Sequence, residues 1–380
     1  MKRSEIVTDV RALNGLDVLG FFTAEHGVGE AARGLVSVLD TAGISRNAIN
    51  YTDTESRMDH DFETQDVSEH AVLFLALNSD HINAATRRMP EGFFDDRYVI
   101  SQWFWELESP APWFREAFPH VNELWAPTRF IEKMLRDCAP EHVKVVYMPP
   151  AVTVPAVDSS MQRTDFGLDD RFTFLFSFDF MSIAKRKNPW GLVQAFTRSF
   201  SDGEGPRLLI KSMNGKRRRE DLETLVEAIG DRSDITLMTD YLTRVEASSL
   251  TSLADCYVSL HRSEGLGLTV TEALSLGVPV IATGYSGNLD FMDEWNTWRV
   301  PCSMTRVGEG AGGYPKDALW AEPDLDAAAR MMREIYENPT DAREKAAKAR
   351  DHVLNTFSVQ AAGTRMKKRL EDIWAELGRG

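Results

Sequence analysis

Hydrophobic and polar positions along the chain follow the pattern of an α/β protein. Short apolar runs that are typical of buried strands, such as residues 71–77 and 278–282, are separated by stretches whose apolar residues recur at helical spacing. The helix expected over residues 128–137 shows this spacing in Phe130, Ile131, Met134 and Leu135. Strands that alternate with helices predict parallel sheets covered by helices on both faces.

The same pattern occurs in two halves of the chain. Strands are expected in the first half at residues 17–22, 71–77, 98–103, 123–126 and 144–148, and helices at 30–42 and 128–137. In the second half strands are expected at 172–178, 207–210, 235–238, 256–260 and 278–282, and helices at 189–200, 218–229, 244–254, 268–276 and through much of 327–377. A polar, proline-containing stretch after Pro149 is typical of a linker. We therefore predict an α/β protein with two Rossmann-like domains facing a cleft, over residues 1–155 and 156–358.

Composition narrows the class of protein. A length of 380 residues suits two domains, and a formal net charge of −15 argues against a nucleic-acid partner, since nucleic-acid binders present a basic face. The 3 cysteines lack the spacing of a disulfide framework or a zinc site, which favours a reducing compartment. We see no signal-peptide pattern and no apolar run long enough to span a membrane, and so expect a cytoplasmic protein. A weak peripheral contact of the protein with the inner membrane face is the alternative.

The segment from His261 to Ala273 combines the features of a ligand site. Glu264 and Glu272 have seven residues between them, with Gly265 and Gly267 following the first glutamate. An expected strand ends just before the segment and an expected helix begins within it, where parallel sheets bind ligands and helix-start amides attract phosphate. A solvated helix start would account for Glu272 as a partner of the helix dipole, but it would leave Glu264 and the glycines unexplained.

These residues, with the small-residue run at 274–284, resemble the retaining glycosyltransferases of family 4, of the bacterial polysaccharide type, which have the GT-B fold. The resemblance spans residues 18–323. It implies that Glu264 contacts hydroxyls of the transferred hexose and that Glu272 holds the ribose of the nucleotide. It further implies that the sugar and diphosphate are surrounded by the amides of Gly265, Leu266, Gly267, Leu268 and Thr269. His261 either lines this donor site or is a structural neighbour. The last helix, residues 359–377, would return to the first domain and complete it.

Cations are expected near the donor diphosphate, because negative charge accumulates on the leaving group. Lys187 matches the lysine that the family places before a helix. The arginine that the family places a few residues earlier is missing, and Arg186 or Lys211 could replace it. An ordinary basic surface turn is the alternative. The basic run at residues 216–219 is interpreted as a solvated helix start with local ion pairs, with a phosphate-bearing acceptor or a membrane as the other possible contact.

The first half contains Gly27 and Gly29 in a match to the dinucleotide fingerprint GxGxxA. The acidic residues downstream of it fit a dehydrogenase poorly, so we expect the two glycines to let the backbone approach donor phosphate or acceptor. His26, Trp105 and Glu106 are candidate acceptor contacts. The alternative for the aromatic stretch around Trp105 is a place in the core.

We therefore expect a metal-independent, retaining hexosyltransferase that uses no cofactor. Its donor would be a GDP-, UDP- or ADP-sugar, with GDP-mannose slightly favoured, and its acceptor a hydroxyl of a glycan or lipid-linked sugar. Since no carboxylate stands out as a nucleophile, we favour attack on the same face as the leaving phosphate, which takes the acceptor proton. The alternatives are a catalytically silent sugar-nucleotide-binding partner and an NAD-type oxidoreductase.

Overall fold

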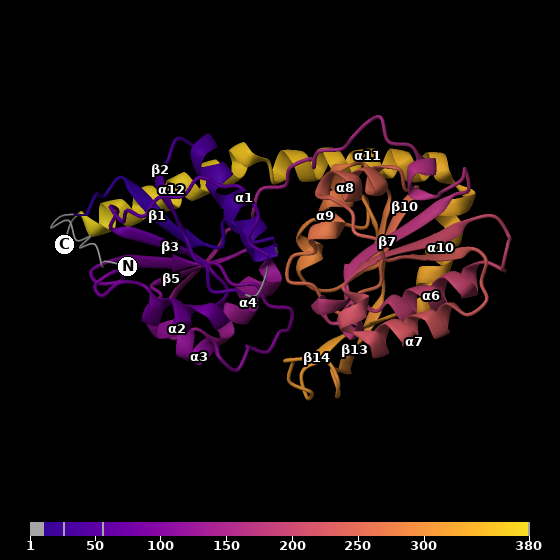
Figure 1. The fold of residues 1–380 in the computed structure, drawn as a ribbon, viewed down its shortest axis with the longest axis horizontal. Coiled ribbons are helices and arrows are strands. Elements are labelled where there is room, and N and C mark those ends of the chain that lie inside the picture. The colour runs from indigo at the N-terminus through magenta and orange to yellow at the C-terminus, as the bar shows by residue number, and fades with distance from the viewer. Residues whose placement is uncertain (1–10, 26, 55–56, 379–380) are drawn as a thin grey trace. The chain divides into compact units, whose positions relative to one another are not determined.

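The computed structural model describes residues 11–25, 27–54 and 57–378. The chain divides into two compact units (Figure 1). The first unit comprises Met1–Trp105, Pro110–Ala151 and Phe357–Gly380, and the second comprises Glu106–Ser109 and Val152–Thr356. The short segment Glu106–Ser109 therefore belongs to the second unit, although its neighbours in sequence belong to the first.

The first unit is built on a six-stranded parallel sheet with the order β2-β1-β3-β4-β5-β6. Its strands are β1 (Gly15–Gly20), β2 (Ser45–Asn50), β3 (Val72–Ala76), β4 (Tyr98–Ser101), β5 (Glu123–Ala126) and β6 (Lys144–Tyr147). Its helices are α1 (Gly27–Thr41), α2 (Ser79–Arg88), α3 (Phe114–Ala117), α4 (Arg129–Cys138) and α12 (Val359–Leu377), with a 3-10 turn η1 (Phe118–His120). Strands β1 and β3 are buried along their whole length, as expected for a parallel sheet covered on both faces.

The last helix completes the first unit, as the resemblance implied. Helix α12 lies along α1 (Figure 1), and its apolar face joins the same core cluster as Leu35 and Leu39 of α1. The two helices approach closely at Gly363, where a Cβ atom would lie 3.0 Å from the Cβ of Ala42.

A buried ionic network also anchors α12 to the sheet. Arg369 of α12 donates through Nε and Nη2 to the carboxylate of Glu123 in β5, at 3.0 Å and 2.6 Å. The same carboxylate accepts from the hydroxyl of Tyr98 and from the indole of Trp125, both at 2.8 Å. Since the Glu123 side chain is 0% exposed, every one of its contacts replaces water that it has lost.

The second unit is built on another six-stranded parallel sheet, with the order β12-β11-β10-β7-β8-β9. Its strands are β7 (Thr173–Asp179), β8 (Arg207–Met213), β9 (Ile235–Met238), β10 (Cys256–Ser259), β11 (Val280–Thr283) and β12 (Trp298–Val300), followed by an antiparallel hairpin of β13 (Cys302–Arg306) and β14 (Leu319–Pro323). Its helices are α5 (Ala184–Lys187), α6 (Pro189–Ser199), α7 (Arg219–Ile229), α8 (Arg244–Ser252), α9 (Leu268–Ser275), α10 (Leu325–Glu337) and α11 (Pro339–Thr356). Its 3-10 turns are η2 (Arg163–Phe166), η3 (Phe180–Ser182), η4 (Gly215–Arg217) and η5 (Gly287–Asp290).

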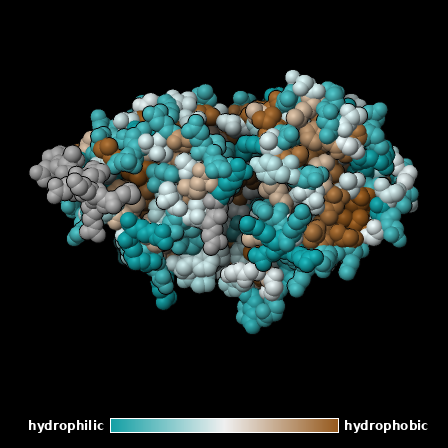
Figure 2. Space-filling model, in the orientation of Figure 1, coloured by the Kyte–Doolittle hydropathy of each residue, from teal (hydrophilic) through white to brown (hydrophobic). Residues whose placement is uncertain are grey.

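The basic run at residues 216–219 differs in one respect from the prediction. The basic side chains of residues 216–219 are exposed, and none of them forms an ion pair with any residue that the structure describes, so the local ion pairs expected there are wrong. The face drawn in Figure 2 is largely hydrophilic, with smaller apolar areas between the polar side chains. No helix within the described ranges is long and apolar enough to span a membrane.

Candidate functional site

The strand order of the second sheet creates a topological switch point between β7 and β10. From these adjacent strands the chain continues toward opposite edges of the sheet, and in open α/β sheets ligands bind at the carboxyl ends of strands at such a switch point. The turn after β7 carries Arg186 and Lys187, and the turn after β10 carries His261 and Glu264. The fold thus brings together four of the residues predicted from the sequence.

The turn that carries the cations is held firmly to the end of β10. Asn188 caps α6 by accepting from the Gly191 amide at 3.2 Å, and its side-chain amide donates to the Leu260 carbonyl at 2.9 Å. The Arg262 amide donates to the Arg186 carbonyl at 2.7 Å. These bonds leave Arg186 and Lys187 with little freedom of main-chain movement.

Glu264 is the centre of a buried ionic cluster. Its carboxylate is 2.5 Å from Lys187 Nζ and 3.1 Å from Arg186 Nη1, which also donates to the Ser263 carbonyl at 2.9 Å. Burial opposes ionisation of Glu264, but Lys187 and Arg186 more than offset it and lower its pKa to about 2. Burial lowers the pKa of Lys187, which Glu264 partly restores. Glu264 is therefore an anion at neutral pH, held by two cations.

His261 lies beside this cluster, and both of its ring nitrogens have protein partners. It is 0% exposed, with Nδ1 3.0 Å from Ser259 Oγ and Nε2 3.0 Å from Asn288 Oδ1. Burial is the main cause that lowers its pKa to about 4, so the ring is neutral near pH 7. The structure thus favours the structural-neighbour interpretation over donor contact.

The glycine-containing loop after Glu264 is held by hydrogen bonds with the residues at the start of η5. Ser286 Oγ accepts from the Glu264 amide at 2.8 Å, and the Gly287 amide donates to the Glu264 carbonyl at 2.9 Å. A Cβ at Gly287 would lie 2.0 Å from the Gly265 carbonyl oxygen, so only glycine fits there. Gly267, with φ 82°, is the N-cap of α9 and has no side chain with which to cap the helix. The loop residues Gly265, Leu266 and Gly267 thus lead directly into the first turn of α9, which begins with Leu268 and Thr269.

Glu272 lies on α9, in a more exposed environment than Glu264. Its side chain is 32% exposed and pairs with Arg244 of α8 at 3.2 Å. Burial of Tyr257 in β10 raises the pKa of its hydroxyl, with smaller contributions from the charges of Glu264 and Glu272. The two glutamates thus differ in their surroundings: Glu264 is buried between two cations, whereas Glu272 is partly exposed beside one arginine.

Lys211 lies on β8 and not in the Glu264 cluster. It is 6% exposed, its ammonium group donates to the Ser212 carbonyl at 3.0 Å, and the acidic groups that act on it are Asp240 and Asp179. Burial lowers its pKa. The structure thus places this cation at a neighbouring strand of the same sheet.

Glu106, predicted as an acceptor contact, has both carboxylate oxygens engaged within the second unit. Oε2 accepts from the Tyr314 hydroxyl at 2.7 Å, and Oε1 is 3.8 Å from Arg186 Nη2. Tyr314 and Arg244 were not predicted from the sequence. Tyr314 lies in a glycine-rich loop far along the chain, and Arg244 in an ordinary helix start, so neither carries a local sequence signal.

The candidate residues of the first unit have mostly structural surroundings. Gly27 and Gly29 are part of α1, which begins three residues earlier than predicted. A Cβ at Gly29 would lie 2.7 Å from the carbonyl oxygens of Phe21 and Ala24, so the chain's own backbone requires this glycine, whereas Gly27 has open space around it. Trp105 is 5% exposed and packs on Trp113, as the core alternative predicted. His26 lies outside the described residues.

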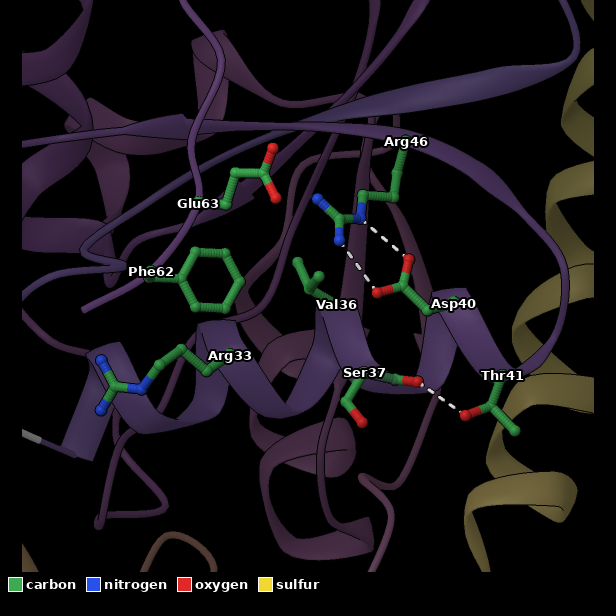
Figure 3. Close-up of a pocket in the computed structure, with 8 residues that line it drawn as sticks. All are labelled: Arg33, Val36, Ser37, Asp40, Thr41, Arg46, Phe62 and Glu63. Carbon is green, nitrogen blue, oxygen red and sulfur yellow. Dashed lines mark hydrogen bonds and ion pairs between the residues drawn. The ribbon is translucent and has the colours of Figure 1, made fainter. Parts of the chain in front are cut away.

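A cavity of ≈ 340 Å³ opens elsewhere in the first unit (Figure 3), beside α1. Three of its charged residues pair with protein groups: Arg46 with Asp40 through two bonds of 2.9 Å, and Arg33 with Glu30 at 3.0 Å. Nothing in this cavity marks it as a ligand site. Among the residues that the structure describes, no group of three or more His, Cys, Asp or Glu side chains could hold a metal ion.

The sequence of this chain is similar to sequences of known glycosyl transferases and of a trehalose synthase. Residues 169–352 match the family described as Glycosyl transferases group 1. A trehalose synthase from Pyrococcus horikoshii is 23% identical over 298 residues, which are 72% of this chain and 66% of that protein. The match thus spans a little under two thirds of that relative's length.

Solved structures resemble almost the whole chain. Anabaena Alr3699/HepE in complex with UDP and glucose has a TM-score of 0.69 at 12% identity, covering 94% of this chain and 99% of that one. Sucrose-phosphate synthase from Thermosynechococcus elongatus has a TM-score of 0.68 at 15% identity, covering 96% and 100%. The chain therefore has the GT-B fold, and the comparisons support a glycosyltransferase whose family match lies in residues 169–352.

Proposed function

We propose that this protein transfers a hexose from a nucleotide diphosphate sugar to a hydroxyl of a glycan or lipid-linked sugar in bacterial polysaccharide or glycoconjugate synthesis. The observation that carries the proposal is the buried cluster of Lys187, Glu264 and Arg186 at the switch point between β7 and β10. A buried carboxylate beside a glycine turn suits sugar hydroxyls, and a cation beside it suits a diphosphate.

Each part of the donor has a proposed partner. Glu264 meets the hexose hydroxyls and Glu272 the ribose, while Lys187 and the amides at the start of α9 meet the diphosphate. Lys211 approaches the nucleotide from β8. Protein groups thus supply the positive charge that the leaving diphosphate requires, without a metal ion. Arg186 is committed to Glu264 and Ser263, so we assign it to holding Glu264 instead of binding phosphate.

We propose that the reaction retains the anomeric configuration through attack on the face of the leaving group. The acceptor oxygen forms the new bond to the anomeric carbon as the bond from that carbon to the phosphate oxygen breaks, and the departing phosphate takes the acceptor proton. Cations hold Glu264, and Tyr314 and Arg186 hold Glu106, which favours this route over a carboxylate nucleophile.

Thermal denaturation with added nucleotides tests the proposal. At a ligand concentration of about 100 times Kd, a nucleotide diphosphate is expected to raise Tm by about 5–10 °C. The screen should include GDP-mannose, which the sequence resemblance favours, and UDP-glucose, because HepE has been solved in complex with it. ADP and its sugars complete the set.

The same screen separates the alternative functions. Stabilisation by NAD alone would favour the oxidoreductase, although β2 ends in Asn50 where a dehydrogenase would place an acidic residue. Stabilisation by none of the nucleotides would contradict the proposal. Release of nucleotide diphosphate from a bound donor sugar would exclude the catalytically silent partner.

Replacement of Glu272 by alanine is expected to raise the donor KM about tenfold, with a much smaller effect on kcat, because one charge-assisted contact to the ribose is lost. Steady-state kinetics with varied donor concentration would measure both constants. Glu227→Ala is the matched control, since Glu227 is an exposed glutamate on α7. An unchanged donor KM for Glu272→Ala would remove the ribose assignment.

A further inference from the structure

The loop between β13 and β14 brings a tyrosine to the edge of the charged cluster. The hydroxyl of Tyr314 donates to Glu106 Oε2 at 2.7 Å, and its ring lies edge-on to Trp320, with 6.4 Å between the ring centroids. The proposed function uses Tyr314 only as a partner of Glu106, and Glu106 in turn faces Arg186.

Arg186 lies between two carboxylates. Its Nη1 is 3.1 Å from Glu264 Oε2, and its Nη2 is 3.8 Å from Glu106 Oε1. The Arg186 side chain is only 6% exposed, so water screens neither attraction effectively. The two glutamates therefore compete for one guanidinium group, and at present Glu264 has the closer contact.

The Tyr314 hydroxyl makes Glu106 the weaker competitor for Arg186. A charge-assisted hydrogen bond fixes one oxygen of Glu106 and takes up part of its negative charge. Without that bond, Glu106 would be free to approach Arg186 more closely than the present 3.8 Å. If the Arg186 guanidinium moved toward Glu106, its ion pair with Glu264 would weaken.

The hairpin is attached well enough to hold Tyr314 in place. Arg262, in the loop after β10, donates through Nε and Nη2 to Glu322 of β14, at 2.7 Å and 3.0 Å. At Gly312, with φ 64°, a Cβ would lie 2.7 Å from Ile183 Cδ1. The glycine thus permits close contact between the hairpin loop and the turn that carries Arg186 and Lys187.

We propose that Tyr314 is a positioning residue that restrains Glu106, keeps Arg186 on Glu264, and so orients the carboxylate that meets the donor hexose. This inference rests on the proposed function, which assigns the hexose to Glu264. It adds a specific consequence: Tyr314 contributes to binding of the sugar and not to binding of the nucleotide.

Calorimetric titration of Tyr314→Phe with two probes tests the inference. The variant is expected to bind the intact sugar nucleotide about tenfold more weakly than the unaltered protein, while affinity for the nucleotide diphosphate alone changes less than about twofold. The probes are the sugar nucleotide that gives the largest stabilisation in the thermal screen and its own nucleotide diphosphate. An equal loss for both probes would show a general structural role and overturn the inference.

A double-mutant cycle with Glu106→Gln tests the route of the effect. Because a neutral amide cannot compete for Arg186, the loss caused by Tyr314→Phe is expected to disappear in the Glu106→Gln background. Additive losses would contradict the inference. Tyr336→Phe is the matched control, because this tyrosine of α10 packs on Phe172 and Phe200, away from the cluster.

The two proposals fail in different ways. If the unaltered protein bound a nucleotide diphosphate but gained no affinity from the attached hexose, the sugar contact assigned to Glu264 would fail, and this inference with it. If the hexose did add affinity and Tyr314→Phe kept the whole gain, only the positioning role of Tyr314 would fail.

Discussion

Replacement of Lys187 by alanine is expected to lower kcat by about 10²–10³-fold. Its ammonium group is the cation closest to Glu264, at 2.5 Å, and it lies in the turn at the switch point of the second sheet. In the proposed reaction it stabilises charge on the departing diphosphate, and an interaction of this kind is strongest in the transition state. Single-turnover measurements with saturating donor would isolate the chemical step.

Two control variants make the Lys187 result specific. Lys216→Ala removes a lysine charge from an exposed position in the same unit, and kcat is expected to stay close to that of the unaltered protein. Lys187→Arg keeps the charge but changes its geometry, and is expected to lie between the alanine variant and the unaltered protein. A kcat within about threefold of the unaltered value for Lys187→Ala would contradict the proposed role.

The acid dependence of the same variant follows from the charges around Glu264. Lys187 and Arg186 lower the pKa of Glu264 to about 2, so this carboxyl group stays ionised throughout the ordinary working range of pH. A lowered carboxyl pKa contributes stability that is present above the unfolded pKa and is lost only as the pH falls toward about 2. Without Lys187 the pKa of Glu264 should rise, and that contribution should be lost at a higher pH.

Much of the candidate site could be predicted from the sequence because its residues are close together along the chain. Glu264 and Gly267 occupy one turn, and Lys187 precedes a helix with a proline at its first position, so local patterns reveal them. Tyr314 and Glu106 meet only in the folded chain, across 208 positions. No local pattern signals such a pair.

The same distinction explains the errors in the fold prediction. Strand β2, Ser45–Asn50, and strand β13 were missed because their residues are mostly polar and lack a continuous apolar run. Strand β14 was missed although it is largely buried, because its apolar run, residues 319–321, is too short to stand out. Strands β5 and β9 were predicted with the observed bounds: β5 is buried throughout, and β9, an edge strand in which only Ile235 is buried, still carries the apolar residues Leu237 and Met238. Helix α1 begins earlier than predicted because glycine, a weak helix former, is tolerated at Gly29, where close packing against the backbone requires it.

Replacement of Arg369 by alanine is expected to reduce the free energy of unfolding of the first unit by about 3–5 kcal/mol. The variant leaves the Glu123 carboxylate 0% exposed and without its cation, and the remaining bonds from Tyr98 and Trp125 supply only neutral donors. Burying an anion without a compensating cation is costly, so the loss should exceed that of an ordinary hydrogen bond.

Chemical denaturation followed by tryptophan fluorescence would measure this loss, because Trp125 lies in the affected network and contributes to the signal. Lys133→Ala is the matched control: it also removes a cation from a helix of the first unit, but its partner Asp137 is exposed, and the expected change is within about 0.5 kcal/mol. A loss for Arg369→Ala no larger than that of the control would show that apolar packing alone holds α12 in place. In the double variant Arg369→Met with Glu123→Leu, neither buried charge remains, and stability is expected to recover well above that of Arg369→Ala, since the cost lies in the unpaired anion.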